Sequence, residues 1–152
     1  MQLRGTASGK TNVVAEHAVV SGDLRTLSLP QLERAKRTMQ AIVAASLPRT
    51  RARIAFEEGY PPMAPTEGNA KLLAMYDKVS RDLGFGGVTA VSPDRAGAAD
   101  VSFVAGEITS IIDGVGLMGH DDHTAKETAD LTTLPSQTKR AAVLLYRITR
   151  QP

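Results

Sequence analysis

The stretch on which the rest of the chain is organised runs from Asp113 to Glu127 and reads Asp-Gly-Val-Gly-Leu-Met-Gly-His-Asp-Asp-His-Thr-Ala-Lys-Glu. It follows the apolar run Ser110-Ile-Ile and contains two of the three histidines of the chain. A β-branched run that breaks into glycines predicts a buried strand that ends in a loop. Ligands of α/β sheets bind at the carboxyl ends of strands, so the sequence places a candidate site in this loop.

The segment His120-Asp-Asp-His123 offers imidazole nitrogens and carboxylate oxygens, which are ligands for divalent transition metals. The same residue types are also ordinary in turns that bind nothing. Their spacing matches none of the defined zinc motifs, so spacing alone leaves both interpretations open.

Composition narrows the class of protein. A chain of 152 residues with 42% hydrophobic and 22% charged residues is typical of a soluble protein with one domain or two small ones. The net charge is +2 and aromatics make up 4%, so nucleic acid is not a favoured partner.

No apolar run approaches eighteen residues and the N-terminus lacks an apolar signal region, so we expect no membrane partner and, by default, a cytoplasmic location. The absence of cysteine excludes disulfides and thiolate ligands.

The first sixty residues predict the order strand, strand, helix, strand. Alternation of apolar and polar residues predicts a strand within residues 11–26. Ser28 is placed as the N-cap of a helix, with Pro30 in its first turn and Gln31 completing a capping box. After Pro48, Arg49, Arg51 and Arg53 alternate with other residues and predict a strand over residues 49–56. These arginines would either protect the edge of a sheet with their charge or bind an anion.

The rest of the chain predicts a layered α/β unit. Prolines over residues 59–65 mark a crossing between two structural units, and Thr66 caps a helix that closes at Gly84. Short strands are expected over residues 88–91 and 109–112, with a short helix over residues 101–105 between them. A last helix starts near Thr133, and its expected buried side consists of Leu134, Thr138, Ala141, Ala142, Leu145 and Ile148.

The flanks of the histidine loop carry a resemblance to a known family. Asp113-Gly-Val-Gly is followed by His123-Thr, Glu127, Asp130-Leu and Leu134-Pro before the final helix. This order resembles the C-terminal signature of the co-catalytic zinc exopeptidases related to carboxypeptidase G (a glutamate carboxypeptidase), aminoacylase and succinyl-diaminopimelate desuccinylase. The resemblance implies that His123 ligates one of two zinc ions in an enzyme that hydrolyses the amide bond of a small peptide or N-acyl amino acid.

The N-terminal part resembles the lid of the same family. Thr11-Asn12-Val and Gly22-Asp-Leu-Arg25 match its Thr-x-Asn-Val and Asp-x-Arg motifs. The resemblance implies that residues 1–60 are the second half of a ferredoxin-like lid or dimerisation domain, and that residues 61–152 are the C-terminal part of an α/β catalytic domain. Asn12 and Arg25 would then hold the substrate carboxylate, a chemistry for which a guanidinium is well suited. Without the resemblance, Asn12 is a turn residue and Arg25 is a solvated strand charge.

Two departures from the family bear on activity. Gly97-Ala-Ala-Asp100 resembles the Gly-rich loop of the family, but an alanine replaces the expected hydroxyl residue, and Asp100 is expected at most to cap a helix. The remaining zinc ligands and the glutamate general base have no counterpart, and a hydrolytic zinc needs three protein ligands. No catalytic residue is therefore assigned.

Three hypotheses follow. The chain is the C-terminal part of a zinc exopeptidase and is inactive alone; or it is a non-catalytic remnant that forms a homodimer through the lid; or it is an unrelated α/β domain whose histidine loop is only a turn.

Overall fold

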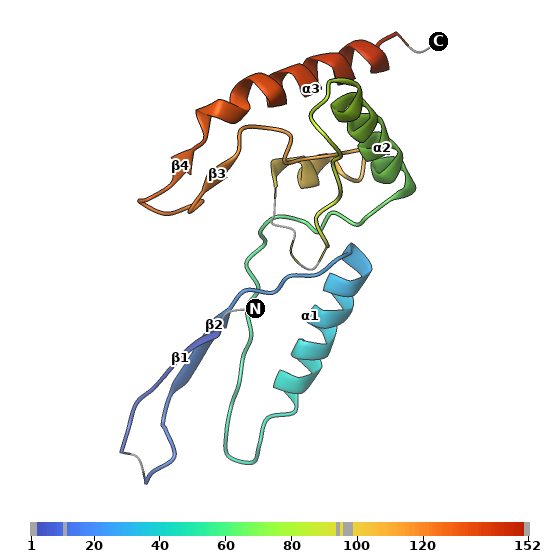
Figure 1. The fold of residues 1–152 in the computed structure, drawn as a ribbon. Coiled ribbons are helices and arrows are strands. Elements are labelled where there is room, and N and C mark those ends of the chain that lie inside the picture. Colours follow the sequence, from blue (N-terminus) through green and yellow to red (C-terminus); the bar gives the residue numbers. More distant parts are fainter. Residues whose placement is uncertain (1–2, 11, 94, 96–98, 151–152) are drawn as a thin grey trace. The chain divides into compact units, whose positions relative to one another are not determined.

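The computed structural model describes residues 3–10, 12–93, 95 and 99–150. The chain divides into two compact units, Met1–Glu57 (unit 1) and Glu58–Pro152 (unit 2), and each is described by itself. Helices and small antiparallel sheets occur together (Figure 1), so the mixed α/β class is confirmed in its coarse form. In the described ranges no helix combines the length and the apolar character needed to cross a bilayer.

Unit 1 begins with a hairpin. Strand β1 (Leu3–Ala7) pairs antiparallel with β2 (Ala18–Gly22), with Leu3 opposite Gly22 and Ala7 opposite Ala18. The strand expected within residues 11–26 is thus confined to β2, because residues 12–17 belong to the connection between the strands. Thr11 lies outside the described residues. Strand β1 was not predicted from the sequence.

Helix α1 (Leu29–Ala44) starts as its capping residues predict. The Ser28 hydroxyl accepts a hydrogen bond from the Gln31 N–H at 3.4 Å, and the Gln31 side chain accepts one from the Leu27 N–H at 2.8 Å. Pro30 lies in the first turn, where its missing N–H needs no partner. The predicted N-terminus of this helix is therefore confirmed.

The strand predicted over residues 49–56 is wrong. The chain turns after α1, with Arg49 at φ 63° and the Thr50 N–H donating to the Leu47 carbonyl at 3.0 Å. The Ala52 N–H donates to the Ser46 hydroxyl instead of to a strand. Ile54 and Phe56 are half-buried, and the Lys36 ammonium of α1 lies over the Phe56 ring at 5.8 Å from its centroid.

Unit 2 is built on two helices, α2 (Glu67–Asp82) and α3 (Leu134–Ile148), which lie side by side (Figure 1). The Thr66 hydroxyl caps α2, as predicted, by accepting from the Asn69 N–H at 3.0 Å. Tyr76, Val79 and Leu144 are buried between the helices. Partly buried apolar side chains surround them, namely Leu72, Met75, Leu83, Val88, Ile112, Val115 and Val143.

Shorter elements complete unit 2. They are the 3-10 helices η1 (Asp100–Val104) and η2 (Leu131–Thr133) and the two-residue strands β3 (Gly119–His120) and β4 (Thr128–Ala129). The short helix expected over residues 101–105 is thus present as η1, shifted by one residue. The last helix begins at Leu134, next to its predicted start.

The strands predicted over residues 88–91 and 109–112 are also wrong, because their backbone groups bond to α2 and not to each other. The Val88 N–H donates to Asp77 Oδ1 at 2.6 Å, and the Ile111 N–H donates to Asn69 Oδ1 at 2.8 Å. The second segment runs so close to α2 that a Cβ at Gly68 would collide with the Thr109 carbonyl oxygen. In the described part of unit 2, α2 therefore replaces the expected layered sheet as the packing surface.

Helix α3 packs with a different face from the one predicted. Of the six residues expected to be buried, only Ala141 is even half-buried. The other five are exposed, namely Leu134, Thr138, Ala142, Leu145 and Ile148. The face turned to α2 instead carries Leu144 and Arg140. The Arg140 Nε donates to the Ser80 hydroxyl at 2.9 Å, and this fully buried hydroxyl donates to the Gly86 carbonyl at 2.7 Å. A satisfied polar network, which an apolar pattern does not reveal, selects this face.

We predict that Ser80→Ala destabilises unit 2 by about 1–3 kcal/mol, because it leaves the Gly86 carbonyl and the Arg140 guanidinium without their shared partner. Urea unfolding at pH 7 measures this free energy. Thr138→Ala, an exposed change on the far side of α3, is the matched control. Equal unfolding midpoints for the two variants would contradict the role given to the network.

We also predict that unit 2 loses stability in acid. The Arg81 guanidinium and the Val88 N–H lower the pKa of Asp77, and Arg147 lowers the pKa of Asp82. A lowered folded-state pKa contributes stability that is present above the unfolded pKa, about 4, and is lost as pH falls through the folded value. Urea midpoints at pH 7 and at pH 3 should therefore differ less in Asp77→Asn than in the unaltered chain. An identical loss in both proteins would refute the assignment.

Candidate functional site

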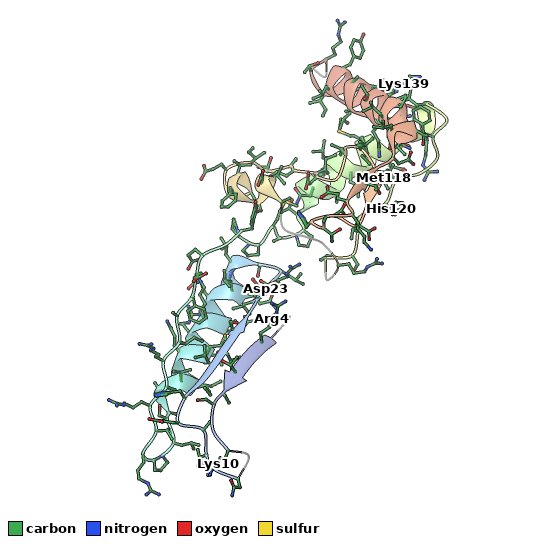
Figure 2. All side chains as sticks on the ribbon, turned by 90° about the vertical axis from the view of Figure 1, so that its left-hand side faces the viewer. Arg4, Lys10, Asp23, Met118, His120 and Lys139 are labelled. Carbon is green, nitrogen blue, oxygen red and sulfur yellow. The ribbon has the colours of Figure 1, made fainter. Side chains whose placement is uncertain are left out.

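The histidine loop is the turn of a small hairpin. In it, β3 and β4 pair antiparallel, with Gly119 opposite Ala129 and His120 opposite Thr128. The Asp130 N–H donates to the Met118 carbonyl at 2.8 Å and extends the pairing by one step. Figure 2 labels Met118 and His120, the residues on either side of Gly119. A Cβ at Gly119 would lie 2.5 Å from the Thr128 carbonyl oxygen, so this close approach of the strands requires glycine.

The base of the hairpin is fixed to the start of α3. The Met118 N–H donates to the Thr133 hydroxyl at 3.2 Å, and this hydroxyl donates to the Asp130 carbonyl at 2.7 Å. Asp130 Oδ1 accepts from the N–H and hydroxyl of Thr132 at 3.0 and 2.6 Å, and these bonds lower the pKa of the Asp130 carboxyl. Asp130 therefore has a structural role, holding η2 between the hairpin and α3.

Thr124 is the centre of the loop that joins the two strands. Its N–H and hydroxyl both donate to the Asp121 carbonyl, at 3.2 and 2.7 Å. The hydroxyl oxygen accepts from the Lys126 N–H at 3.1 Å, and the Thr124 carbonyl accepts from the Glu127 N–H at 3.2 Å. These four hydrogen bonds close residues 121–127 into a defined turn.

His123 lies inside that turn in a left-handed conformation. Its φ is 63°, and that of Asp121 is 58°. The His123 N–H donates to Glu127 Oε2 at 3.1 Å. Residues 120–130 are all exposed, so His123 is not packed into an interior. The loop thus fixes the backbone of His123 and leaves the residue accessible from outside.

The described residues do not complete a zinc site by themselves. Among residues 3–10, 12–93, 95 and 99–150, no three His, Asp or Glu side chains are grouped so that they could hold a metal ion. One imidazole cannot supply the three protein ligands of a hydrolytic zinc. The donors that the described residues offer do not fit a resident zinc, and an ion on His123 would need ligands from outside this set.

The two residues implied to bind the substrate carboxylate are not brought together. Asn12 lies in the exposed connection between β1 and β2, whereas Arg25 lies beyond the other end of β2. The five residues of β2 alone span about 17 Å. The Arg25 Nε already donates to Asp23 Oδ2 at 2.7 Å, with 70% of its side chain exposed. Both residues belong to unit 1, and His123 belongs to unit 2.

The Gly-rich loop is described only in part, because Gly97 and Ala98 lie outside the described residues. Asp100 does not cap η1, whose N-cap is Ala99 without a side-chain hydrogen bond. The Asp100 Oδ1 accepts from the Tyr60 hydroxyl at 3.0 Å, and this bond raises the pKa of Tyr60. The cap expected at Asp100 is therefore wrong; the carboxylate ties η1 to the proline-rich segment.

The His-Thr-x-x-Glu spacing is visible in the sequence, but the spacing alone gives no role to its threonine or its glutamate. The structure gives both a place in the loop, through Thr124 and Glu127. The available signal was the four-residue separation, which lets a carboxylate bond to the N–H of the histidine.

Three comparisons, with models of known families, with curated proteins and with solved structures, found nothing that matches this chain.

Proposed function

We propose that this chain is the C-terminal part of a zinc-dependent exopeptidase that resembles carboxypeptidase G. The substrate would be a small peptide or an N-acyl amino acid with a free carboxylate. His123 would ligate zinc, and the chain alone would hydrolyse nothing because it carries neither the other ligands nor the general base. The observation that carries the proposal is the exposed His123 on a loop fixed by the other residues of the resemblance.

The proposal assigns residues 1–60 to a ferredoxin-like lid and residues 61–152 to the catalytic domain. Support for the lid comes from the order β1, β2, α1, which contains two adjacent antiparallel strands and a helix. Because Asn12 and Arg25 lie at opposite ends of β2, we expect that one substrate carboxylate would meet both only if two copies of the chain contributed to the site. A guanidinium that already bonds a neighbouring carboxylate would exchange that exposed partner at little cost.

Zinc titration tests the metal role of His123. We predict that zinc shifts the imidazole NMR signals of His123 before those of the other two histidines, with weak affinity because one ligand is provided. His123→Gly should abolish this shift while stabilising the chain by up to about 1 kcal/mol, because glycine adopts φ 63° without strain. His17→Gln and His120→Gln are the controls.

The same preparation should release no amino acid from N-acyl amino acids or glutamate-terminated peptides. Turnover by this chain would show that the proposal misjudges which groups are missing. Zinc that leaves the His123 signals unchanged would remove the metal role.

A second candidate, a dimerising remnant without catalysis, is favoured by the surface of unit 1. In the described part of unit 1 no side chain is fully buried, and the hairpin consists of two strands, each with one unpaired edge. Strand β2 carries no charge, and Val19 and Val20 are both 68% exposed. Unprotected apolar edges favour pairing with a second copy.

We predict that the chain sediments as a dimer that dissociates on dilution, and that Val19→Lys shifts it to monomer by placing a charge on the β2 edge. Thr6→Lys is the matched control, because Thr6 lies opposite Val19 on the other strand. A monomer at every concentration would exclude this candidate. Equal effects of both lysines would show that β2 is not the specific edge.

A further inference from the structure

We infer that one end of unit 1 is a peripheral membrane-binding surface, which inserts apolar side chains from two turns into a bilayer that contains anionic lipids. We call it the turn surface. It consists of Lys10, Val13 and Val14 from the β1–β2 connection, and of Leu47, Arg49 and Arg51 from the turn after α1. It lies in unit 1, so it is independent of the role proposed for His123 in unit 2.

Both turns lie at the same end of unit 1, because β2 and α1 run in opposite directions (Figure 1). Figure 2 labels Lys10 at this end, whereas Arg4 and Asp23 are labelled toward the other end. In the described ranges no Cα atom of α1 lies within 8 Å of one in β1 or β2. This end of unit 1 therefore carries two separate protruding turns.

The turn surface exposes apolar side chains on an ordered backbone. Val14 and Leu47 are the most exposed large hydrophobic residues in the described part of the chain, with exposed fractions of 91% and 74%. The Val13 N–H donates to the Lys10 carbonyl at 3.1 Å, and the N–H and hydroxyl of Thr50 both donate to the Leu47 carbonyl, at 3.0 and 2.8 Å. Because the turns are closed by these bonds, the apolar side chains stay in water, and their transfer to an apolar medium would be favourable.

The charge of the turn surface is complementary to anionic lipids. Residues 1–57 contain nine Lys and Arg against four Asp and Glu, and of these acids only Glu16 lies in either turn. The side chains of Lys10, Arg49 and Arg51 form no hydrogen bond or ion pair with another described residue. The carbonyl end of α1 adds about half a negative charge at this end, which the three cations exceed.

A bilayer fits this surface better than another macromolecule does. Lipids rearrange around each protruding turn, whereas a protein partner needs a continuous complementary face. A nucleic acid would use the arginines but would leave Val14 and Leu47 in water. Apolar insertion beside cations that meet anionic headgroups uses both kinds of residue. The expectation of no membrane partner was based on the absence of a spanning run, which a peripheral contact does not require.

Tryptophan fluorescence tests the insertion, because the chain contains no tryptophan of its own. Leu47→Trp places a reporter on the turn surface, and Leu29→Trp places a matched reporter on an exposed leucine at the opposite end of α1. Each full chain is mixed with vesicles of phosphatidylcholine alone or with an equal amount of phosphatidylglycerol. We expect the emission of Leu47→Trp to move to shorter wavelength only with the phosphatidylglycerol vesicles, and that of Leu29→Trp to stay unchanged.

Co-sedimentation with the same vesicles measures the affinity. We expect Leu47→Ser to lower the affinity about tenfold and Arg51→Gln to lower it about fivefold. The controls Leu29→Ser and Arg4→Gln make the same changes toward the other end of unit 1 and should bind like the unaltered chain. Circular dichroism confirms that each variant keeps its helices.

An unaltered chain that does not bind phosphatidylglycerol vesicles, or equal emission shifts of the two tryptophans, would overturn the membrane role. Affinity that falls in Arg51→Gln but not in Leu47→Ser would also overturn it, because the surface would then bind anions without insertion. Self-association that is lost in Leu47→Ser, in a chain that binds no vesicles, would instead assign the turns to a contact with a second copy.

Discussion

The geometry of the histidine loop depends on one hydrogen bond, between the Glu127 carboxylate and the N–H of His123. It holds a histidine at φ 63°, a conformation that L-residues avoid, on an exposed hairpin turn. Thr124 closes the same turn through the Asp121 carbonyl and the Lys126 N–H. Because all of these contacts go to the backbone, the loop has a defined shape while the ring of His123 stays available. Local strain and an accessible imidazole in one place are a reason to look for function there.

The hairpin keeps its place through the core of unit 2. Its base bonds to Thr133, from which α3 begins, and α3 is fixed on α2 by Leu144 and by the Arg140–Ser80 network. Arg140 also bonds Gln137 at 2.8 Å and stacks on Phe85 at 5.1 Å from its ring centroid. With this face of α3 turned to α2, Leu145 lies at the exterior and is 62% exposed. A buried network with all partners satisfied gives the two helices one orientation.

The sequence predicted features that depend on neighbouring residues better than features that depend on distant parts of the chain. Capping is local, so Ser28 and Thr66 were identified correctly as the residues before α1 and α2. A strand needs a partner elsewhere in the chain. Residues 49–56 and 109–112 have the composition of strands, but Ala52 bonds to Ser46 in the turn after α1 and Ile111 bonds to Asn69 of α2. In the candidate site, the resemblance drew attention to His123, but the roles of Thr124 and Glu127 depend on backbone geometry that a motif does not contain.

A crystal structure of the chain grown with zinc tests the central claim most directly. If the proposed function holds, zinc is expected at the His123 imidazole with its other ligands supplied by water or by a second molecule in the crystal, and Glu127 still accepts the His123 N–H. Zinc bound at His17 or His120 with none at His123, or a His123 ring turned back into the packed part of unit 2, would contradict it.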